Sequence, residues 1–175
     1  MPFTAFHLGP ALPIKSLQPK KISLLVFGWA QVLTDLQPLV YILTHRGHLH
    51  GVSHSFLAAL LIGLAAALSG RMVINGLSRL WAKKKAHTAQ TVSLGMALRS
   101  GWLGTFSHVL LDAIIYRDMQ PFWPFIAGNP LATGRLTDRS MMVFCALSGL
   151  LGILIWLVSL ICRRSRRDGQ DQQPL

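Results

Sequence analysis

Four apolar segments constrain the fold of this chain most strongly. They cover residues 22–43, 55–77, 94–116 and 141–162, and the last of them contains no charged side chain. A helix of about 20 residues crosses the ~30 Å hydrocarbon core of a bilayer. Charged residues make up 13% of the chain, against roughly 25% in soluble domains, which is too few to cover a soluble surface. The sequence therefore predicts an all-α integral membrane bundle with about four transmembrane helices.

The basic residues account for the net charge of +11 and predict the orientation of the bundle. With four spans, the amino terminus, the loop between the second and third spans, and the carboxyl terminus share one side of the membrane. That side carries twelve Lys and Arg residues, and the other side carries four. Because positive residues are retained in the cytoplasm, both termini are predicted to be cytoplasmic. Basic residues that flank membrane segments do not indicate nucleic-acid binding, so the lipid bilayer is the expected partner.

The chain is predicted to form one domain with a short tail. Residues 1–162 make up the transmembrane domain, and residues 163–175 form a basic, disordered cytoplasmic tail. Small residues in the second span, such as Ala59, Gly63 and Ala66, permit close packing against a neighbouring helix. The sequence gives no indication of the oligomeric state.

The third segment carries ionisable residues that a bilayer does not readily accept. His108 and Asp112 are four residues apart and therefore share one face of a helix. Gly101 and Thr105 extend this face with a 4-3-4 spacing. Ionisable groups at bilayer depth are costly, usually face the interior of a bundle, and mark functional sites. We therefore expect this stripe to face the other helices.

Two further residues are predicted to lie at the same depth as this pair. Asp35 lies about two turns before the outer end of the first span, and His54 opens the second span from the outer side. At 1.5 Å per residue, all four side chains fall within about 12 Å of the outer boundary. His50 lies four residues before His54 and shares a helical face with it.

Such a set of side chains permits three interpretations. Imidazole and carboxylate groups together suit a zinc, manganese or iron ion. The chain contains no glutamate, so the candidates for a carboxylate ligand or a general base are Asp35, Asp112 and Asp118. A buried Asp–His set also suits a proton relay or transport pathway, or a hydrogen-bonded brace between helices. The residue spacing alone leaves these interpretations open.

Several motifs, taken in order along the chain, resemble those of a known family. They are Met1-Pro2-Phe3-Thr4 with His7-Leu8-Gly9-Pro10, Asp35-Leu36-Gln37-Pro38, residues 49–57, and residues 107–125. In this combination the chain resembles bacterial inner-membrane proteins grouped with predicted membrane-bound, metal-dependent hydrolases, whose relatives include a LexA-regulated, DNA-damage-inducible member. The resemblance covers about residues 1–130.

The resemblance implies a metal site and a reaction. The implied ligands are His7, Asp35, His50, His54, His108 and Asp112. The implied ion is divalent, with zinc first and manganese or iron as alternatives, and the implied location is the inner membrane. Tyr116 stands where the family often has a further histidine, which counts against a second metal.

The implied reaction is hydrolysis of a lipid-like ester or phosphodiester by metal-activated water. Asp118 is the candidate for the general base, or for the residue that orients another group. A non-enzymatic membrane protein, either a small transporter or a metal-stabilised structural component, is the alternative.

His7 poses a topological conflict in this interpretation. It precedes the first span on the predicted cytoplasmic side, whereas the other candidates lie toward the outer side. We therefore expect residues 3–14 to re-enter the membrane as a broken half-helix, for which Pro10 and Pro13 are suggestive.

Overall fold

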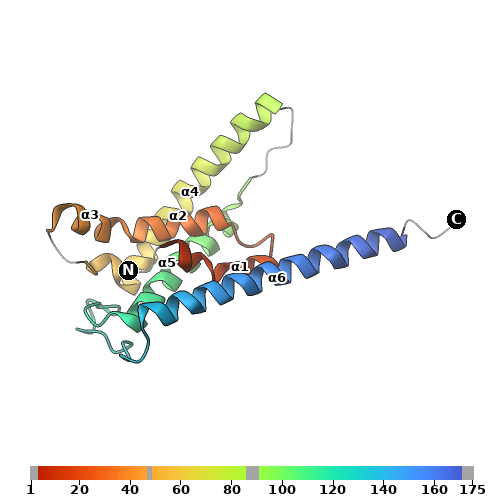
Figure 1. Cartoon of the computed structure of the whole chain (residues 1–175). Coiled ribbons are helices and arrows are strands. Elements are labelled where there is room, and N and C mark those ends of the chain that lie inside the picture. Colours follow the sequence, from red (N-terminus) through yellow and green to blue (C-terminus); the bar gives the residue numbers. More distant parts are fainter. Residues whose placement is uncertain (1–3, 47–48, 86–90, 171–175) are drawn as a thin grey trace.

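A computed structural model describes residues 4–46, 49–85 and 91–170, and within these ranges the chain is helical with no strand (Figure 1). Two short 3-10 helices and six α-helices follow one another along the chain. They are η1 (Thr4–Leu8), α1 (Ala11–Leu17), α2 (Leu24–Thr34), α3 (Leu36–Thr44), η2 (Val52–His54), α4 (Phe56–Lys85), α5 (Leu94–Ile115) and α6 (Asp138–Gln170). The predicted all-α class is therefore confirmed.

Helix α5 lies at the centre of the assembly, in contact with α2, α4 and η1 (Figure 1). A Cβ atom at Gly101 would lie 2.4 Å from the carbonyl oxygen of Gly63 on α4, and one at Gly104 would lie 2.8 Å from that of Phe27 on α2. Glycine is therefore required at both positions for the backbones to approach this closely. Gly101, Thr105, His108 and Asp112 are all buried, so the polar stripe faces the other helices as predicted.

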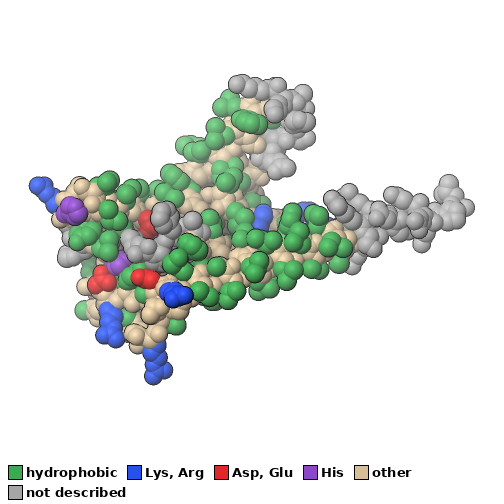
Figure 2. Space-filling view, viewed as in Figure 1, with side chains coloured by type: hydrophobic (Ala, Val, Ile, Leu, Met, Phe, Trp, Pro, Cys, Tyr) green, Lys and Arg blue, Asp and Glu red, His purple; other side chains and the backbone are tan. Residues whose placement is uncertain are grey.

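Two helices, α4 and α6, are long and apolar enough to cross a membrane by length and composition. The stretches Phe56–Lys83 and Asp138–Arg163 each contain an 18-residue window of high mean hydropathy, 2.1 in the first and 2.5 in the second. On the face seen in Figure 2, apolar side chains lie along both helices. The second stretch contains the predicted fourth span, and the first contains the predicted second span except for its first residue. Helix α5 coincides with the predicted third span to within one residue.

The predicted first span, residues 22–43, is not one continuous helix. It divides at Asp35 into α2 and α3. Pro38 has no N–H to donate to the carbonyl of Thr34, and its ring would crowd that carbonyl in a continuous helix. With 11 residues, α2 is about 16 Å long and too short to cross a bilayer alone. The break sets Asp35 at a helix junction, and the count of four spans stays a prediction.

The segment before α2 packs along α6. A Cβ atom at Gly9 would lie 2.0 Å from the carbonyl oxygen of Cys145, and one at Gly152 would lie 2.5 Å from the Cβ atom of Leu12. The hydroxyl of Ser16 donates to the carbonyl of Gly152 over 2.7 Å. Because these contacts advance along both segments together, α1 runs in the same direction as α6. Helix η1 is thereby brought against α2, α5 and the first turns of α6.

Helix α6 extends beyond the start of the predicted tail. It continues to Gln170, so residues 163–170, which were assigned to the tail, belong to the helix. Arginine and glutamine are good helix formers, and adding residues to an existing helix avoids the cost of nucleation. Residues 171–175, also assigned to the tail, lie outside the described part of the chain. The cytoplasmic location of both termini stays a prediction.

We predict that the contact between α4 and α5 does not tolerate a methyl group. Replacing Gly101 by alanine should lower the free energy of unfolding by about 1–3 kcal/mol, because the new atom meets backbone rather than a flexible side chain. Gly76→Ala on α4 is the matched control, since a Cβ atom there meets nothing within 4 Å. Thermal unfolding of both variants in detergent measures the difference. Equal melting temperatures would contradict the packing described here.

Candidate metal centre

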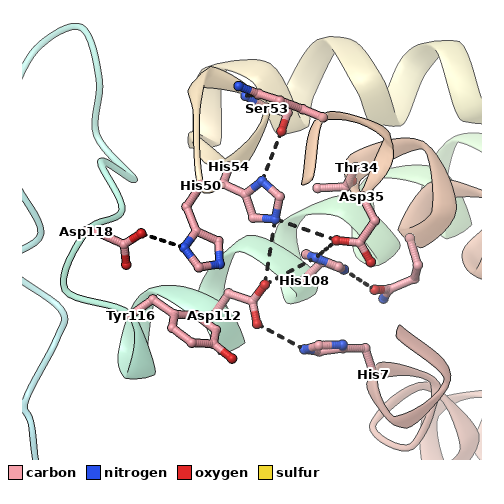
Figure 3. Close-up of polar contacts among 12 residues, drawn as sticks. His7, Thr34, Asp35, His50, Ser53, His54, His108, Asp112, Tyr116 and Asp118 are labelled. Carbon is pink, nitrogen blue, oxygen red and sulfur yellow. Dashed lines mark hydrogen bonds and ion pairs between the residues drawn. The ribbon is translucent and has the colours of Figure 1, made fainter. Parts of the chain in front are cut away.

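Five of the predicted site residues meet at one place in the fold (Figure 3). They come from separate segments and are brought together around the carboxyl-terminal half of α5. They are His7 from η1, Asp35 from the junction of α2 and α3, His54 from η2, and His108 and Asp112 from α5. The three histidines and Asp112 are each at most 2% exposed.

Asp35, His54 and His108 form a group that can hold a metal ion. Each offers one ligand atom, and these atoms all lie within 4.8 Å of one another. The Oδ1 atom of Asp35 lies 3.1 Å from Nε2 of His108 and 3.7 Å from Nε2 of His54. The three residues come from three separate segments, so the group depends on the tertiary fold.

Asp112 links this group to His7. Its Oδ2 atom lies 3.3 Å from Nε2 of His108 and 3.7 Å from Nε2 of His54. Its Oδ1 atom lies 3.4 Å from Nε2 of His7. Asp112 thus approaches both histidines of the group with one oxygen and His7 with the other, although it does not belong to the group of three.

Two histidine rings are oriented by hydrogen bonds at their Nδ1 atoms. The Nδ1 atom of His108 is hydrogen-bonded to Oε1 of Gln31, and Nδ1 of His54 is bonded to the hydroxyl of Ser53 over 2.9 Å. The Nε2 atoms of both rings have no hydrogen-bond partner among the described residues. Histidine ligands of metals commonly use one nitrogen for the ion and bond the other to a neighbour. Buried polar atoms without a partner are rare in proteins and call for an explanation.

The separations between these atoms fit a divalent ion. Nitrogen and carboxylate ligands lie about 2.0–2.2 Å from zinc in tetrahedral sites, which places neighbouring ligand atoms about 3.4 Å apart. The four distances from the imidazoles of His54 and His108 to carboxylate oxygens are 3.1–3.7 Å. Burial lowers the pKa of His54, although the neighbouring carboxylate of Asp35 acts in the opposite direction. The neutral imidazole that a metal needs is therefore favoured at His54.

His50 and Asp118 form a separate pair beside this cluster. The Nδ1 atom of His50 lies 2.8 Å from Oδ2 of Asp118. The ring of His50 stacks on Tyr116 with centroids 4.4 Å apart, and its buried Nε2 atom has no hydrogen-bond partner in the described part of the chain. The imidazole of His54 lies close by, with ring centroids 5.5 Å apart. His50, expected as a ligand from the family resemblance, is therefore not in the group of three.

A cavity of about 310 Å³ opens at this pair. Its lining includes His50, Val52, Asp118, Gln120 and Trp123. The side chain of Asp118 is 62% exposed, whereas that of His50 is 1% exposed. The pair of His50 and Asp118 thus lies between the open cavity and the buried cluster.

The residues that orient the histidines were not predicted from the sequence. Gln31 is a single amide in an apolar run, four residues before Asp35, and this spacing on one helical face could have indicated its role. Ser53 adjoins His54 in the sequence, but its contact with the ring depends on the turn of η2. No motif marks either residue.

One family matches the chain over most of its length. The family described as YdjM inner membrane protein matches residues 12–168, which include every predicted site residue except His7. No curated protein and no solved structure matches the chain. The match agrees with the resemblance stated above to inner-membrane proteins with a LexA-regulated member. On this evidence the chain belongs to the YdjM inner membrane protein family.

Proposed function

We propose that the protein is a membrane-embedded, metal-dependent hydrolase that cleaves a lipid-like ester or phosphodiester. One observation carries this proposal. The Nε2 atoms of His54 and His108 lie without hydrogen bonds against the carboxylates of Asp35 and Asp112, while their Nδ1 atoms are bonded to other side chains. A cluster held together by hydrogen bonds alone would be expected to satisfy these buried nitrogens.

Within this proposal, His54, His108 and Asp35 hold one divalent ion, preferably zinc, with manganese or iron as alternatives. Asp112 is the fourth candidate ligand, and His7 lies against the carboxylate oxygen of Asp112 that does not face His54 and His108. When bound, such an ion supplies Lewis acidity, which polarises an ester or phosphoryl oxygen and makes water more acidic.

We assign proton transfer to His50 and its orientation to Asp118. The Asp118 carboxylate accepts the Nδ1–H of His50, which leaves Nε2 as the basic nitrogen. His50 can then accept the proton of the attacking water and return it to the leaving oxygen. This division of roles is the arrangement in which an aspartate fixes the tautomer of a catalytic histidine.

A lipid-like substrate is supported by the surroundings of the pair. The family is a membrane family, and the cavity beside His50 is walled by Val52 and Trp123, which are 52% and 41% exposed. Tryptophan is common where a protein meets the polar–apolar boundary of a bilayer. The cavity therefore offers apolar contact beside the polar pair, as an ester or phosphodiester with an acyl chain requires.

The remaining buried polar residues argue against a transport pathway. Among the described residues, the buried polar residues outside the cluster region include Ser23, Asn75 and Ser100. The backbone N–H of Ser23 donates to the hydroxyl of Ser100, which itself donates to a backbone carbonyl. The amide of Asn75 bonds to the backbone of another residue. None of them is titratable, so they do not continue the His–Asp cluster across the assembly. A structural metal site is the alternative function, because an ion here would tie together α2, η2 and α5.

We predict that Gln31 contributes to metal affinity without contacting the ion. Gln31→Ala should weaken metal binding by about 10–100-fold, because the ring of His108 loses the acceptor that orients it. Gln31→Glu keeps an acceptor for the same N–H and should retain most of the affinity. Competition with a chromophoric chelator measures both constants. Unchanged affinity in Gln31→Ala would show that the hydrogen bond has no role in binding.

The proposed reaction is tested by separating metal binding from turnover. The purified, metal-loaded protein should release product from a panel of phospholipid and acyl-ester substrates, and a chelator should stop the release. His50→Ala and Asp118→Asn should lower the rate, the first by about 10²–10⁴-fold, because the proton acceptor is removed. Both variants should keep the metal content of the wild type.

Two results would count against this assignment. Loss of the metal in His50→Ala would make His50 a ligand. A metal that raises the melting temperature of the protein, with no hydrolysis of any substrate in the panel, would identify a structural site instead.

A further inference from the structure

A second cavity lies far from the metal cluster, between α1, the turn that follows it and α6. Its volume is about 400 Å³. Its walls are largely apolar and are formed by Leu12, Leu24, Ile153, Trp156 and Leu160. Two basic residues, Lys15 and Arg163, also line it. No part of the proposed hydrolytic site contributes to this cavity.

The two basic residues differ in how firmly they are held. The ammonium group of Lys15 donates to the carbonyl oxygens of Pro19 and Ile22 over 2.6 and 2.7 Å. A lysine has three N–H donors, so one remains for another acceptor. Arg163 is exposed and makes no ion pair with any described residue. The ammonium group of Lys15 is thus held in place, whereas the side chain of Arg163 can adjust to a ligand.

No carboxylate whose side chain the structure describes lines this cavity, and residues 163–175 carry four arginines against two aspartates. Asp35, Asp112 and Asp118 surround or adjoin the metal cluster, and Asp138 begins α6. Asp138 and Arg163 are 25 positions apart on one helix, which corresponds to about 38 Å. The cavity therefore combines a positive potential with an apolar wall, and its natural complement is an anionic amphiphile.

The position along α6 agrees with such a ligand. Arg163 is the last residue of the apolar stretch Asp138–Arg163, so it lies where that stretch would leave the hydrocarbon core. Trp156 and Ile153 lie about two and three turns earlier on the same helix. A phospholipid whose phosphate meets Arg163 would place its acyl chain beside these residues. Basic pockets between membrane helices are known to bind anionic head groups.

We infer that this cavity binds one anionic phospholipid of the surrounding membrane, with its phosphate between Lys15 and Arg163 and one acyl chain against Leu12, Ile153 and Trp156. The lipid fills the space between α1 and α6 and does not reach the metal cluster. The lipid has a structural role in this inference and is not a substrate of the proposed hydrolase.

The inference is tested with the full-length protein in detergent, to which dioleoylphosphatidylglycerol or dioleoylphosphatidylcholine is added at equal concentration. Native mass spectrometry counts the lipid retained, and the melting temperature reports binding to the folded state. The wild type should retain one phosphatidylglycerol and gain stability, and phosphatidylcholine should bind more weakly. Arg163→Gln should bind phosphatidylglycerol about fivefold more weakly, because one cation near the phosphate is lost.

Two control variants test whether phosphatidylglycerol binds at this cavity. Arg135→Gln removes an exposed cation from the loop before α6 and should bind phosphatidylglycerol as the wild type does. His108→Ala disrupts the metal cluster and should also retain the lipid, which separates this site from the proposed hydrolytic one. Equal binding of the two lipids by the wild type, wild-type affinity in Arg163→Gln, or loss of the lipid in His108→Ala would each overturn the inference.

Discussion

Contact between buried imidazole and carboxylate groups is the interaction on which the rest of this structure depends. Removing ionisable groups from water costs several kcal/mol per ion, and the cost is recovered only when partners are close and well oriented. Here His54 and His108 lie within 3.7 Å of both Asp35 and Asp112. The packing of the helices must hold several separate segments at these separations at once.

The close approach of the backbones makes this possible. Glycines on α5 let α2 and α4 reach it without intervening side chains, and the break at Asp35 turns a carboxylate toward α5. The close contact between Gly9 and Cys145 carries η1, and with it His7, to the same place. Polar groups that would be costly against lipid are thereby enclosed by helices that expose many large apolar side chains.

Periodicity and spacing were sufficient to predict the helical class and most of the cluster. The i, i+4 relation of His108 and Asp112 fixes a shared face, and the depth of Asp35 and His54 follows from their distance to the ends of apolar segments. The break at Asp35 does not follow from hydropathy, because residues 22–43 are mostly apolar and long enough for one span, although Pro38 disfavours a continuous helix there. The partnership of His50 with Asp118, and of His108 with Gln31, depends on contacts over 68 and 77 positions of the chain, which no local pattern encodes.

Metal content measured by elemental mass spectrometry tests the central claim most directly. The full-length protein, His108→Ala and the exposed control His45→Ala would be purified in detergent and compared. The account predicts about one zinc, manganese or iron ion per chain in the wild type and in His45→Ala, and its loss in His108→Ala, which should still insert into the membrane. Wild-type metal content in His108→Ala, or no metal in any of the three proteins, would contradict it and leave the cluster as a brace between helices.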